Sequence, residues 1–224
     1  MAASCNTGEY LRDVEYVENI PNSKYMSLSR LKFTRGNKRF SWDLAFRHDS
    51  VACVLYHREK NSLLFVKQFR PAVYLTKIRR MQENQGIPLN RIDYSKYAVS
   101  LGETIELCAG LIDKPKLSAV EHMREEILEE CGYSVNIDAL RLIKKFIVGI
   151  GLSGSVQHLF YAEINDAQKV NDGGGTDSEK IEKVWMTLHE AHKYCEGIEV
   201  DSAPGLLYGL SWFFEHVHPM DAQG

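Results

Sequence analysis

Short apolar runs follow one another along most of the chain, and polar turns rich in glycine and asparagine separate them. Runs of this length with this punctuation are typical of β-strands. The pattern predicts two short strands between Met26 and Phe46 around a turn at 35–37, then strands at Ser50–Tyr56, Ser62–Phe69, Thr104–Ala109, Leu142–Gly149, Val156–Ile164 and Ile181–Met186. The polar stretch His57–Asn61 predicts that the strands on either side of it form a hairpin.

The clearest helical periodicity lies between Ser118 and Cys131. Ser118 can cap this helix, and Glu121 completes a capping box three residues later. Gly132 follows the last periodic residue, where a glycine commonly ends a helix. The chain therefore predicts one central helix with defined ends.

Two further helices are expected towards the end of the chain, at about Leu188–Tyr194 and Leu206–Val217. The mixed polar stretch Lys77–Ser100 predicts an insertion loop. The segment Asn171–Ser178 contains three consecutive glycines and predicts a mobile loop. Strands, one central helix, further strands and terminal helices in this order predict an α+β sandwich.

The composition is that of an ordinary globular protein: 224 residues, 44% hydrophobic and 25% charged, with a formal net charge of −3. A chain of this length makes one large domain, or one domain with a small appendage. The weak net charge gives no general attraction to nucleic acid. No apolar run reaches the roughly 18 residues of a membrane span, and residues 1–10 lack the features of a secretory signal. The five cysteines are scattered without a CxxC pair, so we expect a soluble cytoplasmic protein without nucleic-acid or membrane partners.

The densest candidate chemistry is the acidic edge of the central helix. At about 100° per residue, Glu126 and Glu130 lie about 40° apart at the border of the apolar stripe, and Glu129 adjoins them. Two carboxylates four residues apart repel each other, and partial burial raises the cost because a desolvated charge needs a partner. The sequence offers no basic residue on that edge. A hard divalent cation such as Mg²⁺ or Mn²⁺ would resolve the conflict, whereas a solvated acidic face is the ordinary alternative.

This helix and the strand before it resemble the Nudix box, in which a glycine and a short loop precede a helix with the pattern Arg-Glu-(apolar)-x-Glu-Glu-x-Gly-(apolar). The matching residues are Glu126, Ile127, Glu129, Glu130, Gly132 and Tyr133, preceded by the similar opening segment Glu106–Gly110. Three positions depart from the pattern: Glu125 stands at the arginine position with Arg124 one place early, Leu117 (or Lys116, counted from the glycine) stands at the first glutamate position, and Gly110 lies one residue too far from the helix. The first departure removes an arginine that usually orients the helix ligands.

Two other segments, Val66–Tyr74 and Ser41–Asp43 with Arg47, are similar to those of nucleoside-diphosphate-sugar pyrophosphatases. A further set resembles the UDP-glucose branch most: Glu106–Leu111, Glu129–Tyr133, Gly151–Ser155, Gly173–Gly175 and Ser211–Phe213. The resemblance implies a Nudix α/β/α sandwich with a mixed sheet and an N-terminal antiparallel strand extension. It also implies a homodimer, in which residues 1–48 serve dimerisation and base binding and residues 49–224 form the hydrolase domain.

The resemblance further implies the metal ligands. The side chains of Glu126 and Glu130 would hold Mg²⁺ (or Mn²⁺) directly, and Glu129 would be a further ligand or a water-mediated catalytic partner. The backbone carbonyl of Ala109, just before the glycine, would also bind metal.

The resemblance draws the catalytic base and the substrate contacts from other segments. A glutamate before the last strand acts as the base in related hydrolases, and Glu179 matches it best, with Asp177 as the alternative. Trp42 would stack on the nucleotide base, and Arg47 and Arg70 would contact the diphosphate. A core position for Trp42 and salt bridges for the two arginines are the ordinary alternatives.

The activity implied by this resemblance is the metal-dependent hydrolysis of a nucleoside diphosphate sugar, with UDP-glucose giving UMP and glucose 1-phosphate. ADP-ribose is the nearest competing substrate, because the phosphate chemistry is common to both. A degenerate module that binds nucleotide sugars without cleaving them is a different class of answer, suggested by Glu125 and the extra residue in the loop.

Overall fold

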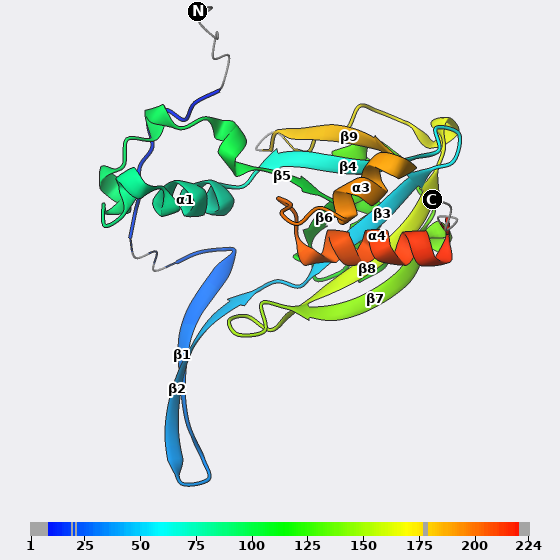
Figure 1. Cartoon of the computed structure of the whole chain (residues 1–224). Coiled ribbons are helices and arrows are strands. Elements are labelled where there is room, and N and C mark those ends of the chain that lie inside the picture. The colour runs from blue at the N-terminus through cyan, green and yellow to red at the C-terminus, as the bar shows by residue number, and fades with distance from the viewer. Residues whose placement is uncertain (1–8, 19, 21, 177–178, 220–224) are drawn as a thin grey trace, which may run out of the picture.

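The computed structural model describes residues 9–18, 20, 22–176 and 179–219, which form two sheets (Figure 1). The smaller is a hairpin of β1 (Met26–Arg35) and β2 (Lys38–Arg47). The larger contains β3 (Ser50–His57), β4 (Ser62–Phe69), β5 (Glu103–Glu106), β6 (Cys108–Leu111), β7 (Arg141–Val148), β8 (Ser155–Ile164) and β9 (Ile181–Thr187). These strands confirm the predicted ones, except that the single strand predicted at Thr104–Ala109 is divided at Leu107 into β5 and β6.

The large sheet forks where β3 and β4 separate. β4 pairs with β3 at 62–64 and then with β5 at 66–69, whereas β3 pairs with β6 at 50–53. The chain from β5 into β6 therefore crosses from one half of the sheet to the other. β3 and β8 are parallel and the other pairs are antiparallel, so the sheet is mixed, as expected.

Helices cover both faces of this sheet, which makes the α/β/α sandwich that the family resemblance implied. On one face, Met123 of α2 (Ala119–Glu126) lies in a buried core with Val66 of β4. On the other face lie α3 (Leu188–Cys195) and α4 (Pro204–His216), where Leu210 packs in a second core with Val54 (Figure 1). Two 3₁₀ turns, Ile137–Ala139 and Asp166–Gln168, precede β7 and follow β8. Within the described residues, none of the helices has the length and apolarity that a membrane crossing requires.

The stretch after β4 is helical, which corrects the loop predicted for Lys77–Ser100. α1 (Pro71–Arg80) starts with a proline, and 3₁₀ turns follow at Gln82–Asn84, Leu89–Arg91, Tyr94–Lys96 and Val99–Gly102. Tyr74 and Ile78, one helical turn apart, are buried in a small separate core with Ile92. α1 follows β4 after a single residue, and its apolar residues Ala72, Val73 and Leu75 continue the apolar run of the strand, so the sequence pattern did not separate the helix from the strand.

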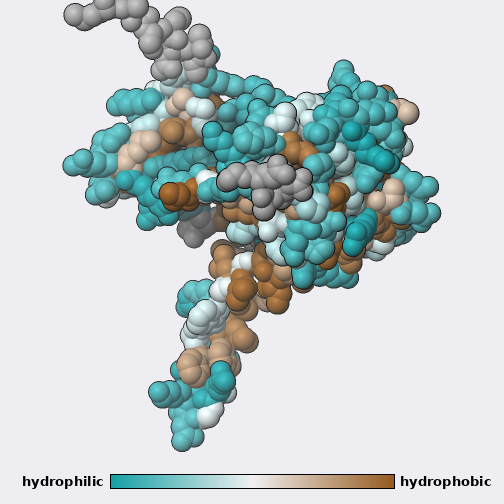
Figure 2. All heavy atoms as spheres, turned by 45° about the vertical axis from the view of Figure 1, so that its right-hand side comes forward, coloured by the Kyte–Doolittle hydropathy of each residue, from teal (hydrophilic) through white to brown (hydrophobic). Residues whose placement is uncertain are grey.

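The β1–β2 hairpin projects from the body as an arm (Figure 1). Its register places Leu31 opposite Trp42 and Phe33 opposite Phe40, and all four side chains are exposed. Figure 2 shows the resulting apolar surface along the arm. At its base, the Trp42 indole N–H donates to the Gly151 carbonyl at 2.9 Å. The arm thus presents an apolar face that the described part of the same chain leaves uncovered.

Candidate active site

The helix that carries the candidate ligands has the ends that the sequence predicted. Ser118 and Glu121 form the capping box, with each side chain bonded to the backbone N–H of the other residue. After α2 the helix widens into one π-turn, Ile127–Cys131, and Gly132 ends it at φ +80°. This left-handed conformation favours glycine. The defined ends fix which glutamates face the sheet.

Glu130 is buried, with 4% of its surface exposed, and one carboxyl oxygen accepts the backbone N–H of Ala109 at 3.0 Å. The pKa of Glu130 is raised to about 8, chiefly by burial and also by the charges of Glu126 and Glu179, while the hydrogen bonds from Cys108 and Ala109 act to lower it. A carboxylate in this environment needs a positive partner. The strand β6 therefore holds Glu130 against the fork of the sheet.

Glu126 lies against the next residue of the same strand, Gly110. A Cβ atom added at Gly110 would lie 1.8 Å from a carboxyl oxygen of Glu126, so only glycine allows this approach. Burial raises the pKa of Glu126 to about 7, and the charges of Glu129 and Glu179 add to the shift. Gly110, the glycine before the helix in the Nudix-like segment, thus leaves the space that the carboxyl group of Glu126 occupies.

This donor set fits a hard divalent cation. Glu126 and Glu130 present carboxyl oxygens, Ala109 contributes its backbone beside them, and the exposed Glu129 lies close enough for its charge to affect Glu126. Mg²⁺ and Mn²⁺ prefer such oxygen ligands. The raised pKa values show that the ionised carboxylates are unfavourable here, and the charge of a bound cation would offset this. Because Glu126 and Glu130 are partly or fully buried, the ordinary alternative of a solvated acidic face does not describe them.

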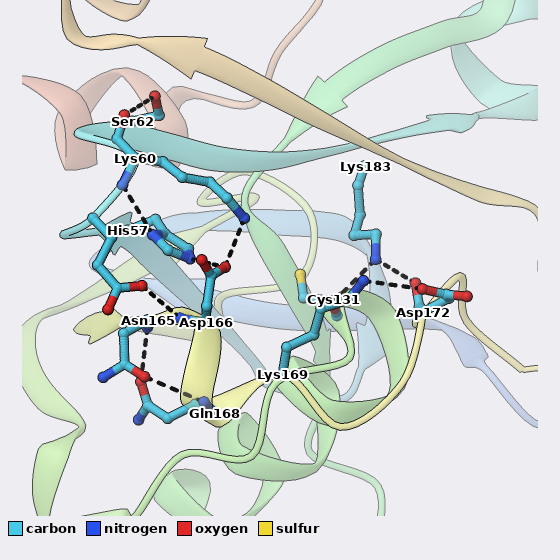
Figure 3. Close-up of polar contacts among 11 residues, drawn as sticks. His57, Lys60, Ser62, Cys131, Asn165, Asp166, Gln168, Lys169, Asp172 and Lys183 are labelled. Atoms are coloured by element: carbon cyan, nitrogen blue, oxygen red, sulfur yellow. Dashed lines mark hydrogen bonds and ion pairs between the residues drawn. The ribbon is translucent and has the colours of Figure 1, made fainter.

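A different acidic group lies at the far end of β3. In the part of the chain that the structure describes, His57, Glu59 and Asp166 are the group whose ligand atoms already lie within 4.8 Å of one another. The Lys60 ammonium lies 3.1 Å from the Asp166 carboxylate, and the buried His57 ring lies 3.2 Å from the same oxygen (Figure 3). A lysine already neutralises this carboxylate, so the group is a paired surface cluster rather than a metal site.

The prediction that the ligand edge has no basic neighbour is wrong, because the loop before α2 places Lys114 beside it. Lys114 bonds to Glu125 at 2.6 Å, and its charge lowers the pKa of Glu126 against the other influences. Glu125, which stands at the family's arginine position, therefore recruits a lysine to the helix. The sequence could not show this pairing because the two residues belong to different elements.

Arg70, at the end of β4, forms a bidentate ion pair with Glu106 of β5, with both N–O distances at 2.7 Å. This is the salt bridge that was the ordinary alternative for Arg70. The charges of Glu130 and Glu179 nevertheless reach Arg70 and help to raise its pKa, after the larger effect of Glu106. Glu106 was missed as a site residue, although it opens the Nudix-like segment. The sequence pattern gave no signal for it, because its pairing with Arg70 depends on the register of β4 against β5, in which Val66 lies opposite Glu106.

Glu179 lies just before β9, and its carboxylate accepts the backbone N–H of Thr176 at 3.3 Å. Its charge raises the pKa values of Glu126 and Glu130, which places it on the same side of the molecule as the candidate ligands. The alternative base, Asp177, lies outside the described residues. Glu179 is therefore near enough for its charge to act on Glu126 and Glu130, but no described hydrogen bond joins it to either of them.

Trp42 and Arg47 are not joined to the carboxylates by any contact that the structure describes. Trp42 lies on the arm, 53% exposed, so it is not a core residue. Arg47 ends β2 and borders a surface hollow of about 310 Å³ with Lys24 and Tyr25. Within one chain, the site therefore consists of the helix carboxylates, the β5–β6 strand, Arg70 and the Glu179 loop.

A mixed sheet between two helical layers, with a capped glutamate helix packed on a glycine-bearing strand, defines the class of Nudix hydrolases. The chain belongs to this superfamily, in the group of nucleotide-sugar pyrophosphatases. It is 38% identical over 203 residues to the uridine diphosphate glucose pyrophosphatase NUDT14 of Bos taurus, covering 88% of this chain and 91% of the relative. The Mus musculus protein of the same name is 35% identical, with coverages of 88% and 92%. A GDP-mannose pyrophosphatase of Cronobacter sakazakii is 33% identical over 72% of each chain. No protein-family model matches the chain.

Proposed function

We propose that the protein hydrolyses the diphosphate of a nucleoside diphosphate sugar with the help of Mg²⁺, for which Mn²⁺ can substitute, and that UDP-glucose gives UMP and glucose 1-phosphate. The observation that carries this proposal is the pair of carboxyls of the half-buried Glu126 and the buried Glu130, held with raised pKa values against Gly110 and Ala109. The names of the two mammalian relatives favour UDP-glucose, and those of the bacterial relatives add GDP-mannose as a candidate substrate.

The residues divide the chemistry between them. A cation held by Glu126 and Glu130, with Glu129 and the Ala109 carbonyl as further partners, would offset the negative charge of the diphosphate. Arg70 is poised to bind a phosphate oxygen while Glu106 fixes the plane of its guanidinium. In the reaction a water oxygen bonds to phosphorus, the bridging P–O bond breaks, and the base takes the proton of the water.

We assign the base to Glu179, whose carboxylate is oriented by Thr176. Glu179→Gln is expected to lower kcat by about 100- to 10,000-fold, because a positioned base contributes roughly that factor. Asp177→Asn serves as the matched control and is expected to stay within about threefold of wild type, since it changes an acid of the same loop. Steady-state kinetics decide: loss in Asp177→Asn with activity retained in Glu179→Gln would reverse the assignment.

The direct test of the function is incubation of the purified protein with UDP-glucose, GDP-mannose and ADP-ribose, each with Mg²⁺ or with a chelator. We expect UMP and glucose 1-phosphate only when the metal is present, with UDP-glucose the preferred substrate. A preference for ADP-ribose or GDP-mannose would change the assigned substrate but leave the proposed reaction, hydrolysis of the diphosphate, unchanged. Binding without turnover of any of the three would favour the degenerate module.

We also propose a homodimer in which the arm, within residues 1–48, covers a second copy and brings Trp42 and Arg47 to the nucleotide base and diphosphate of the partner's substrate. The exposed apolar face of the arm supports this arrangement. We expect Phe33→Asp to convert a dimer into a monomer, because it places a charge in that face. Lys32→Asp, on the opposite face of the same strand, is expected to remain dimeric. Light scattering coupled to size-exclusion chromatography measures both; a monomeric wild type would contradict the proposal.

We place the protein in the cytoplasm. The ordinary composition and the scattered cysteines favour a reducing compartment. The four described cysteines are free, which agrees with that environment: Cys53, Cys108, Cys131 and Cys195.

A further inference from the structure

The helix that carries the candidate ligands ends in four carbonyl groups that the helix itself cannot satisfy. Three of the four accept a hydrogen bond from the backbone of the loop between β8 and β9. The Glu129 carbonyl accepts the N–H of Gly175 at 3.1 Å, and the Glu130 carbonyl accepts that of Gly174 at 2.9 Å. The Gly132 carbonyl accepts the N–H of Val170 at 2.9 Å. The fourth, at Cys131, is taken by a side chain.

The glycine triplet is needed for this close contact. A Cβ atom added at Gly173 would lie 2.3 Å from the Glu130 carbonyl oxygen, and Gly173 has φ +61°. Gly174 and Gly175 also have positive φ, at +108° and +85°. The segment predicted as a mobile loop is therefore docked on the helix end from Val170 to Gly175, because its glycines allow the backbone to approach.

Lys183 supplies the side chain that closes this contact. Its ammonium donates to the Cys131 carbonyl at 3.4 Å and also to the carbonyl of Asp172 (Figure 3). Lys183 lies on β9, where it is paired with Val66 of β4. One charged group thus links the helix end, the docked loop and the central sheet.

The same loop leads to Glu179, which lies two residues before β9. Ile181, the first residue of that strand, donates its N–H to the Gly174 carbonyl at 3.2 Å. A shift of the loop on the helix end would therefore move Glu179 relative to Glu130. We propose that Lys183 is a positioning residue of the active site, which fastens the Glu179 loop to the carbonyl end of the helix that carries Glu130. The effect on turnover rests on the proposed function, whereas the docking can be measured on the protein alone.

The test compares Lys183→Met with Lys169→Met. Lys169 also contacts Asp172, but it pairs with the exposed carboxylate at 3.1 Å and not with backbone carbonyls, so it is a matched control (Figure 3). Hydrogen exchange of the peptide that covers 170–176 reads the docking directly, and a peptide from β3 reports on the global fold. We expect Lys183→Met to speed exchange in 170–176 roughly tenfold or more, with β3 unchanged. With UDP-glucose and Mg²⁺, kcat should fall about 10- to 100-fold while KM changes less than about threefold.

Lys169→Met should match the wild type in both measurements. The proposal is overturned if exchange in 170–176 stays at the wild-type rate, if β3 loses protection to the same extent, if Lys169→Met has an equal effect, or if kcat is unchanged although the loop is released. Should the wild type hydrolyse no nucleotide sugar, the proposed function fails, and the exchange measurement alone decides whether Lys183 fastens the loop.

Discussion

Glu130→Gln is expected to abolish metal-dependent turnover and, at the same time, to make the metal-free protein more resistant to heat at alkaline pH. The glutamine keeps the shape of the side chain and can still accept the Ala109 N–H. It cannot supply the negative charge that holds a cation, so we expect kcat to fall at least about 1,000-fold, which corresponds to the several kcal/mol that a metal contributes.

The stability effect follows from the direction of the pKa shift. The folded-state pKa of Glu130 is about 8, above its ordinary value of 4.5. For an acid whose pKa is raised by folding, stability is lost as pH rises from the unfolded value through the folded one. The wild type without metal therefore loses stability from about pH 4.5 to about pH 8, and the glutamine variant lacks this loss.

Thermal melts with chelator at pH 5 and pH 9 measure the difference. We expect equal melting temperatures at pH 5 and an advantage of at least about 3 °C for Glu130→Gln at pH 9, given that 1 kcal/mol moves a domain of this size by roughly 2–4 °C. Glu121→Gln, on the exposed cap of the same helix, should retain activity. Full activity in Glu130→Gln, or a lower melting temperature at pH 9, would remove Glu130 from the site.

The second large effect is on metal affinity, which is expected to rise about 100-fold between pH 6.5 and pH 8.5. The ligands must lose their protons before they bind metal. With pKa values of about 7 for Glu126 and about 8 for Glu130, both carboxyls are mostly protonated at the lower pH and mostly ionised at the higher one. Isothermal titration calorimetry with Mn²⁺ gives the affinity at each pH.

The same experiment counts the protons released, when it is repeated in buffers of different ionisation enthalpy. We expect nearly two protons per bound ion at pH 6.5 and well under one at pH 8.5. Glu130→Gln should release about one fewer at pH 6.5 and bind much more weakly at both pH values. An affinity that does not change with pH, without proton release, would mean that Mn²⁺ binds elsewhere, for example at exposed carboxylates.

The parts of the molecule that local sequence determines were predictable. The helix from Ser118 to Gly132 follows from a capping box and a C-terminal glycine, which act over a few residues. The strands, and the pairs joined by a short turn such as β3 with β4, follow from the short apolar runs and the turn residues between them. The position of Glu126 and Glu130 at the edge of the buried face follows from the helical period. Their raised pKa values agree with the cost, expected from the sequence, of placing two carboxylates close together and partly buried.

Contacts between distant segments could not be predicted from pattern. The pairing of Arg70 with Glu106 depends on the register of β4 and β5, and that of Lys114 with Glu125 depends on the path of a loop. The docking of the glycine triplet reversed the expectation of a mobile loop, because glycine permits close packing as well as freedom. Sequence periodicity predicts the structure of each helix or strand separately, whereas these contacts form only when the elements pack together.

The fork in the sheet also divides the candidate site of this protein into two halves. Arg70 and Glu106 belong to the half built on β4, whereas Gly110, with Glu126 above it, belongs to the half built on β3. The junction is the buried Leu107, which packs towards α4. A change of volume at this hidden position would alter the span between the arginine and the acidic groups while every charged residue stayed the same. Adaptation to a longer or bulkier phosphate ester can therefore begin in the interior of the protein.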